Sequence, residues 1–180
     1  MQHQMEVLKK SIRRWLAFFM VALVLSGLTA LDVETGIWWL SGHFGPGTIQ
    51  DWISKVLASV REVGLNHRFL FYGYDWLAFA HLVISVAFIG PYKDPVRNKW
   101  VIQFGRIAAC MVIPFAFIAG GIRGIPLWWQ LVDCSFGIVA LVPLTRCWWL
   151  IEKLEILEEK EAALDKPKSK CQYHTFFQNL

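Results

Sequence analysis

Residues 15–31 read WLAFFMVALVLSGLTAL and contain no charged side chain. A helix of this length rises about 25 Å, close to the thickness of the hydrocarbon core of a bilayer. The residues just before it include Lys9, Lys10, Arg13 and Arg14. Because basic residues flank membrane helices on the cytoplasmic side, we predict a first span over 15–31 with the N terminus inside.

The same segment has the layout of a secretory signal, in which a basic start precedes an apolar run. The run is long for a signal, and Leu28 would occupy the −3 position of a cut after Ala30, where a small residue is usual. We therefore expect the first span to be retained.

Three more apolar segments follow, over 69–90, 100–119 and 127–149. The whole chain of 180 residues is 56% hydrophobic and only 18% charged, a balance typical of membrane proteins. The sequence thus predicts an all-α fold, a polytopic transmembrane four-helix bundle over residues 1–150, followed by a charged cytoplasmic tail over 151–180.

The charges of the loops support one orientation. Lys93, Arg97 and Lys99 lie between the second and third spans, and Arg146 and Lys153 lie around the end of the fourth. This pattern places both termini in the cytoplasm of a multi-pass protein of the bacterial inner membrane. The formal charge of +4 is then expected to face lipid headgroups, with no role in binding nucleic acid.

Residues 48–63 are predicted to form an amphipathic helix that lies on the outer membrane interface. Thr48 is placed as its N-cap, after a hinge at Gly45, Pro46 and Gly47. Its apolar residues recur with helical spacing at Ile49, Trp52, Ile53, Val56, Leu57 and Val60.

Beyond the fourth span, the helix is expected to continue into the cytoplasm until Pro167. Leu150, Leu154, Leu157 and Leu164 keep a spacing of three or four residues, interrupted by Glu161, among charges of both signs. A solvated extension is the simpler interpretation, and a dimerising or partner-binding handle is the alternative.

Ionisable side chains inside spans are costly unless they are paired or hydrated, so they mark a candidate intramembrane polar site. There are four: Asp75, His81, Arg106 and Asp133. Their depths describe a polar column across the membrane if the helices face one another. Asp75 and Asp133 are candidates for a proton relay with Arg106 or Arg123 as counter-charge. The alternative is that they tie the outer helix ends to Arg68, Arg123 or backbone groups.

His67, Tyr74 and His81 are spaced by seven residues, which places them on one face of a continuous helix. Two histidines at this spacing resemble the haem-bearing helices of the cytochrome b family, in which one helix gives an axial ligand to each of two stacked haems. The resemblance implies haem binding at His67 and His81. No other predicted span contains histidine, so the partner ligand would be His81 of a second copy or Cys110, and a hydrogen-bonded structural histidine is the alternative.

The cysteines do not predict a disulfide framework. Cys110, Cys134 and Cys147 are expected to be reduced and packed in the core, while Cys171 and His174 have metal-ligand spacing but provide too few ligands. We predict no metal site.

Three stretches resemble small, uncharacterised four-span bacterial inner-membrane proteins. They are DPVRNKW at 94–100, GIPLWW at 124–129 and LVDCSFG at 131–137. The resemblance implies a four-span fold and no activity.

Three functions are compatible with these patterns. The first is a non-enzymatic accessory, assembly or scaffold subunit that binds the bilayer and another membrane protein or a second copy of itself. The second is a redox or proton-relay protein that binds b-type haem or quinone, and the third is a small transporter.

Overall fold

The computed structural model describes residues 1–165, and within them the chain forms helices joined by short turns. The helices are α1 (Gln2–Leu31), α2 (Val33–Ser41), α3 (Thr48–Asn66), a 3-10 turn η1 (Arg68–Phe71), α4 (Tyr72–Ala87), α5 (Ile89–Lys93), α6 (Lys99–Arg123) and α7 (Leu127–Asp165). Four stretches are long and apolar enough to cross a membrane: Gln2–Leu31, Arg68–Lys93, Lys99–Arg123 and Leu127–Leu164. The prediction of an all-helical fold is therefore confirmed for the described residues, as is the prediction of four helices long and apolar enough to span a membrane.

The chain divides into two compact units, and α1 contributes to both. The first unit contains Met1–Trp15 and the described chain from Pro91 onward, and the second contains Leu16–Gly90.

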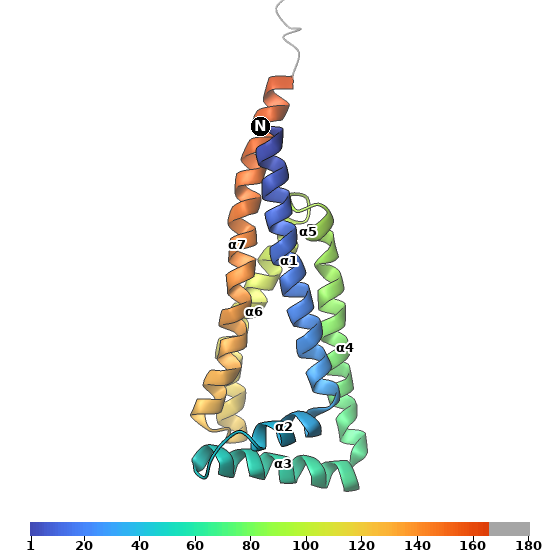
Figure 1. The fold of residues 1–180 in the computed structure, drawn as a ribbon, viewed down its shortest axis with the longest axis vertical. Coiled ribbons are helices and arrows are strands. Elements are labelled where there is room, and N and C mark those ends of the chain that lie inside the picture. The colour runs from blue at the N-terminus through green and yellow to red at the C-terminus, as the bar shows by residue number, and fades with distance from the viewer. Residues whose placement is uncertain (166–180) are drawn as a thin grey trace, which may run out of the picture. The chain divides into compact units, whose positions relative to one another are not determined.

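In the first unit, α6 and α7 pack along each other as a hairpin (Figure 1). Gly124 ends α6 in the left-handed conformation, and the Ile125 amide donates to the Gly120 carbonyl at 2.9 Å. The observed turn between α6 and α7 is thus shorter than predicted, because α6 continues to Arg123.

Close packing of the hairpin depends on glycine. A Cβ atom added to Gly137 of α7 would lie 2.6 Å from the Ala109 carbonyl oxygen of α6. Only hydrogen at this position lets the two backbones approach so closely.

The first part of α1 packs on the second half of α7. Ile12 of α1 is fully buried, and its carbonyl oxygen lies 3.9 Å from the Cys147 thiol. On α7 the fully buried residues Leu144, Cys147, Ile151 and Leu154 follow the three-four spacing of a coiled-coil seam. We expected the extension of α7 to be solvated on all sides. Instead, one of its faces is covered by α1, which begins at Gln2.

In the second unit, α2 and α3 lie along each other around the Gly45, Pro46 and Gly47 turn (Figure 1). The sequence did not predict α2. It also misplaced the start of α3: Gly47 is the N-cap and Thr48 is the first residue of the helix, so the Thr48 hydroxyl caps nothing.

Within this unit, η1 contacts both α3 and α4, and residues of α1 meet the last turn of α4. Phe19 and Phe88 meet edge to face with ring centroids 4.8 Å apart, and the Ser85 hydroxyl donates to the Met20 carbonyl at 3.4 Å. The loop after the second span begins later than predicted, because the chain is helical through Lys93 in α5.

Candidate functional site

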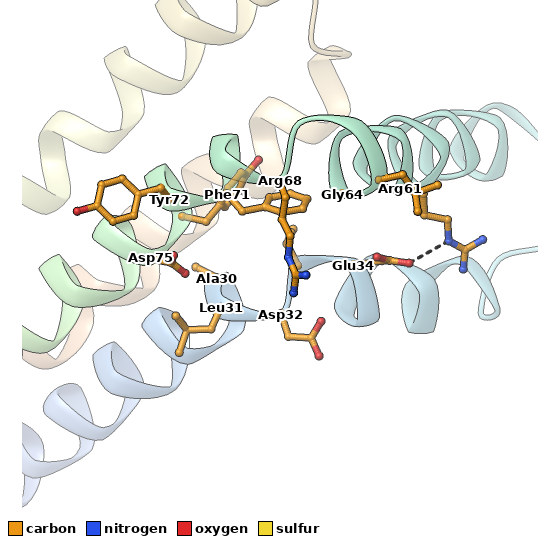
Figure 2. A pocket seen from close by; sticks show the side chains of 13 residues that line it. Ala30, Leu31, Asp32, Glu34, Arg61, Gly64, Arg68, Phe71, Tyr72 and Asp75 are labelled. Carbon is orange, nitrogen blue, oxygen red and sulfur yellow. Dashed lines mark hydrogen bonds and ion pairs between the residues drawn. The ribbon is translucent and has the colours of Figure 1, made fainter.

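The second unit contains a cavity of about 620 Å³ at the junction of the first and second spans. Its walls come from the end of α1, the start of α2, the last turns of α3, η1 and the first turn of α4 (Figure 2). Each of these segments is the end of a helix, so polar side chains can reach the cavity without entering an apolar span.

Five charged side chains line this cavity: Asp32, Glu34, Arg61, Arg68 and Asp75. Arg61 and Glu34 form an ion pair at 3.1 Å, with both side chains about half exposed. Asp32 caps α2 by accepting a hydrogen bond from the Thr35 amide at 3.2 Å.

The other two charges have no such partner. Within residues 1–165, no hydrogen bond or ion pair joins the Arg68 guanidinium or the Asp75 carboxylate to another group. The structure therefore does not show the tie between Asp75 and Arg68 that was one interpretation of this carboxylate. Asp75 lies in the first turn of α4, where the exposed amides of a helix stabilise a negative charge.

His81 lies on α4, outside this cavity, and packs against α1. Its Nδ1 lies 2.8 Å from the Leu77 carbonyl oxygen and donates a hydrogen bond to it, and within residues 1–165 no group is hydrogen-bonded to Nε2. Gly27 of α1 permits the approach, because a Cβ there would lie 2.7 Å from the His81 Cβ.

The prediction that His67 shares a helical face with Tyr74 and His81 is wrong. His67 has φ −139° and ψ 45°, a non-helical conformation between α3 and η1. The helix that holds Tyr74 and His81 begins only at Tyr72. The three residues therefore do not share one face of a single helix. The resemblance to a two-haem helix depended on that shared face and is not supported.

Arg106 and Asp133 belong to the first unit. The Arg106 guanidinium lies over the Trp148 ring, 5.0 Å from its centroid. Asp133 lies on α7 about 22 Å from Trp148, toward the N-terminal end of the helix, at about 1.5 Å per residue. Because the Arg106 guanidinium lies against Trp148, it cannot be the direct counter-charge of Asp133. The full polar column, which joins residues of both units, stays a prediction.

The cysteines of the described chain are free thiols. Cys134 and Cys147 are buried as predicted, whereas Cys110 is exposed on α6 and does not pack in the core. No group of three metal-ligating side chains gathers within residues 1–165, and Cys171 and His174 lie outside them.

A second hollow lies between the first turns of α1 and the extension of α7. It has a volume of about 470 Å³, and its walls are mainly apolar. Val7 and Leu8 of α1 and Ile156 and Leu157 of α7 form the apolar part, with His3, Gln4 and Lys153 at the edges. Both Val7 and Ile156 are 52% exposed. We call this surface the α1–α7 groove.

Comparison with known proteins yields no relative. No protein-family model matches the chain, and no curated protein or solved structure matches it either.

Proposed function

We propose that this chain is a non-enzymatic accessory subunit of the bacterial inner membrane, whose α1–α7 groove binds an amphipathic helix of a partner membrane protein. The observation that carries this proposal is an apolar groove at a part of the molecule that lies beyond the predicted spans. Side chains such as Val7 and Ile156 gain nothing from lipid there.

The length of α7 supports this position. Its 39 residues rise about 58 Å, whereas the hydrocarbon core of a bilayer is about 30 Å thick. With the fourth span over 127–149, Ile156 lies about 10 Å past its end. Val7 precedes the first span by a similar distance, and Lys9 and Lys10 lie between Val7 and the start of that span.

The groove is held in shape by its own helices. The Lys9 ammonium and the Glu158 carboxylate form an ion pair at 2.9 Å beside it. Ile151 and Leu154, in the same part of α7, are fully buried. A third helix laid into a preformed groove between two others buries its apolar stripe at small cost in ordering, as in helical bundles.

The test is site-specific photo-crosslinking in intact cells, with the reactive amino acid at Val7 or at Ile156. We expect both positions to yield one common protein adduct. Glu159, which is exposed and does not line the groove, is the matched control and should yield none. With the reactive amino acid at one of these positions, an Asp at the other (Ile156→Asp or Val7→Asp) should abolish the adduct while abundance and unfolding temperature are kept, because both side chains are exposed.

Three outcomes would contradict the proposal. Adducts between two copies of the chain would make the groove a homodimer interface, adducts with lipid alone would place it in the bilayer, and equal adducts from Glu159 would show that contact is unspecific.

A second candidate is a redox protein that binds b-type haem or quinone at His81, and the free Nε2 of this residue favours it. A bond from Nδ1 to a backbone carbonyl is the usual way to orient a metal-ligating imidazole. Among residues 1–165, α4 has no second histidine beside His81, so the second axial ligand of a haem would be His81 of a second copy or Cys110. Sharp reduced bands in the visible spectrum of the purified protein, lost in His81→Ala, would favour this candidate over the first.

A further inference from the structure

The geometry points to a binding site for a phosphate–ammonium zwitterion, the headgroup chemistry of phosphatidylethanolamine, in the cavity between Arg68, Asp75 and Asp32. This inference concerns the second unit and does not depend on the α1–α7 groove.

The charges of the cavity suit a ligand that carries both signs. With Arg61 and Glu34 paired to each other, one guanidinium and two carboxylates remain, from Arg68, Asp32 and Asp75. A simple anion would meet one favourable group and two repulsive ones. A simple cation would leave Arg68 without an anion, whereas a zwitterion can complement all three.

The donor and acceptor groups have matching chemistry. A guanidinium offers parallel N–H donors that fit two phosphate oxygens, and an ammonium has three donors for carboxylate oxygens. Asp32 uses Oδ1 for the Thr35 amide, so its second oxygen can accept another bond. In Figure 2 the Arg68 side chain extends from η1 toward the end of α1, where Asp32 lies.

The apolar part of the wall fits the rest of a lipid. Leu31, Leu65 and Tyr72 line the same cavity and are 53%, 86% and 63% exposed. Leu31 ends α1, and Arg68 begins the second candidate span. Headgroups lie at this depth of a bilayer, just outside the hydrocarbon core. A soluble phosphoethanolamine would use the same charged groups without these apolar contacts.

The test measures lipid retention by the full-length protein. The protein is reconstituted in nanodiscs that contain equal parts of phosphatidylethanolamine, phosphatidylcholine and phosphatidylglycerol. It is then extracted in mild detergent, and its bound lipid is measured by native mass spectrometry. We expect preferential retention of phosphatidylethanolamine, reduced about tenfold in Arg68→Gln and in Asp75→Asn, since each removes a charged hydrogen-bonding partner.

Matched controls exist for both substitutions. Asp51→Asn removes a carboxylate from the first turn of α3, and Arg123→Gln removes a guanidinium from the last turn of α6; neither residue lines the cavity. Both should retain lipid as the original chain does. Arg68→Lys should recover part of the retention, and all variants should unfold at similar temperatures because the altered side chains are exposed.

A separate arm adds soluble phosphoethanolamine to the purified protein. Displacement of lipid only at high concentration assigns the lipid as the source of the zwitterion. Tight binding of the soluble compound, again lost in Arg68→Gln, would support recognition of the phosphate–ammonium group and would assign a free ligand as its source. Equal retention of all three lipids, preference for phosphatidylglycerol, or indifference to Arg68→Gln and Asp75→Asn would overturn the inference.

Discussion

The α6–α7 hairpin and the cavity of the second unit use polar side chains in opposite ways. In the hairpin, Gln130 is buried and donates to the Ile125 carbonyl at 2.7 Å, and Lys99 binds Glu155 at 2.8 Å. In the cavity, Arg68 and Asp75 have no partner among the described residues. Polar groups that are satisfied within the chain stabilise its fold, whereas charges without partners beside a cavity are available to a ligand.

The largest effect on stability should come from adding a methyl group where α6 and α7 pack closely, at Gly137. In Gly137→Ala the new Cβ would meet the Ala109 carbonyl oxygen, a backbone atom that cannot move aside. We expect the free energy of unfolding to fall by about 2 kcal/mol. Gly121→Ala on α6 is the control, because its Cβ would meet nothing within 4 Å. Thermal unfolding in one detergent compares the two, and equal stability of both variants would refute the close contact.

A smaller effect is expected at the open end of the hairpin, where α6 begins. The Lys99 ammonium binds Glu155 and also lies 4.6 Å from the centroid of the Trp148 ring. The Lys99 side chain is only 24% exposed. Lys99→Gln should therefore lower the free energy of unfolding by about 1 kcal/mol, and the loss should depend weakly on salt. An unchanged unfolding midpoint would show that this pair adds no stability.

The smallest effect is expected in the second unit. Arg61 and Glu34 are 50% and 48% exposed, so water and salt screen their attraction. Arg61→Gln should change the free energy of unfolding by less than about 0.5 kcal/mol. A loss as large as that of Lys99→Gln, measured under the same conditions, would remove the contrast between the two units.

The sequence predicts the spans well because continuous apolar runs depend on local composition alone. It also predicts the helix over 48–63, whose apolar stripe is complete within the segment. It fails for α2, where Asp32, Glu34 and Gly36 interrupt the apolar pattern. That helix is held by its cap and by packing on α3, and neither is visible in a local pattern.

The candidate site was only partly predictable for the same reason. Asp75 was singled out because it lies in a span, but Asp32, Glu34 and Arg61 lie on other elements and look like ordinary surface charges in sequence. The available signal was weak: these charges stand near the ends of two consecutive spans. His67 shows the opposite error, since regular spacing suggested one helix where the backbone turns.

The predicted topology, on which the proposed function depends, places the paired ends of α1 and α7 in the cytoplasm and the α2–α3 segment outside. Single cysteines at Gln4, Glu159 and Thr48 can be tested in intact cells with a membrane-impermeant thiol reagent, with the unsubstituted chain as the reference for its native cysteines. We expect the cysteine at position 48 to react in intact cells, and those at positions 4 and 159 to react only after the membrane is opened. Reaction of position 4 or 159 in intact cells, or protection of position 48, would contradict this topology and with it the cytoplasmic groove.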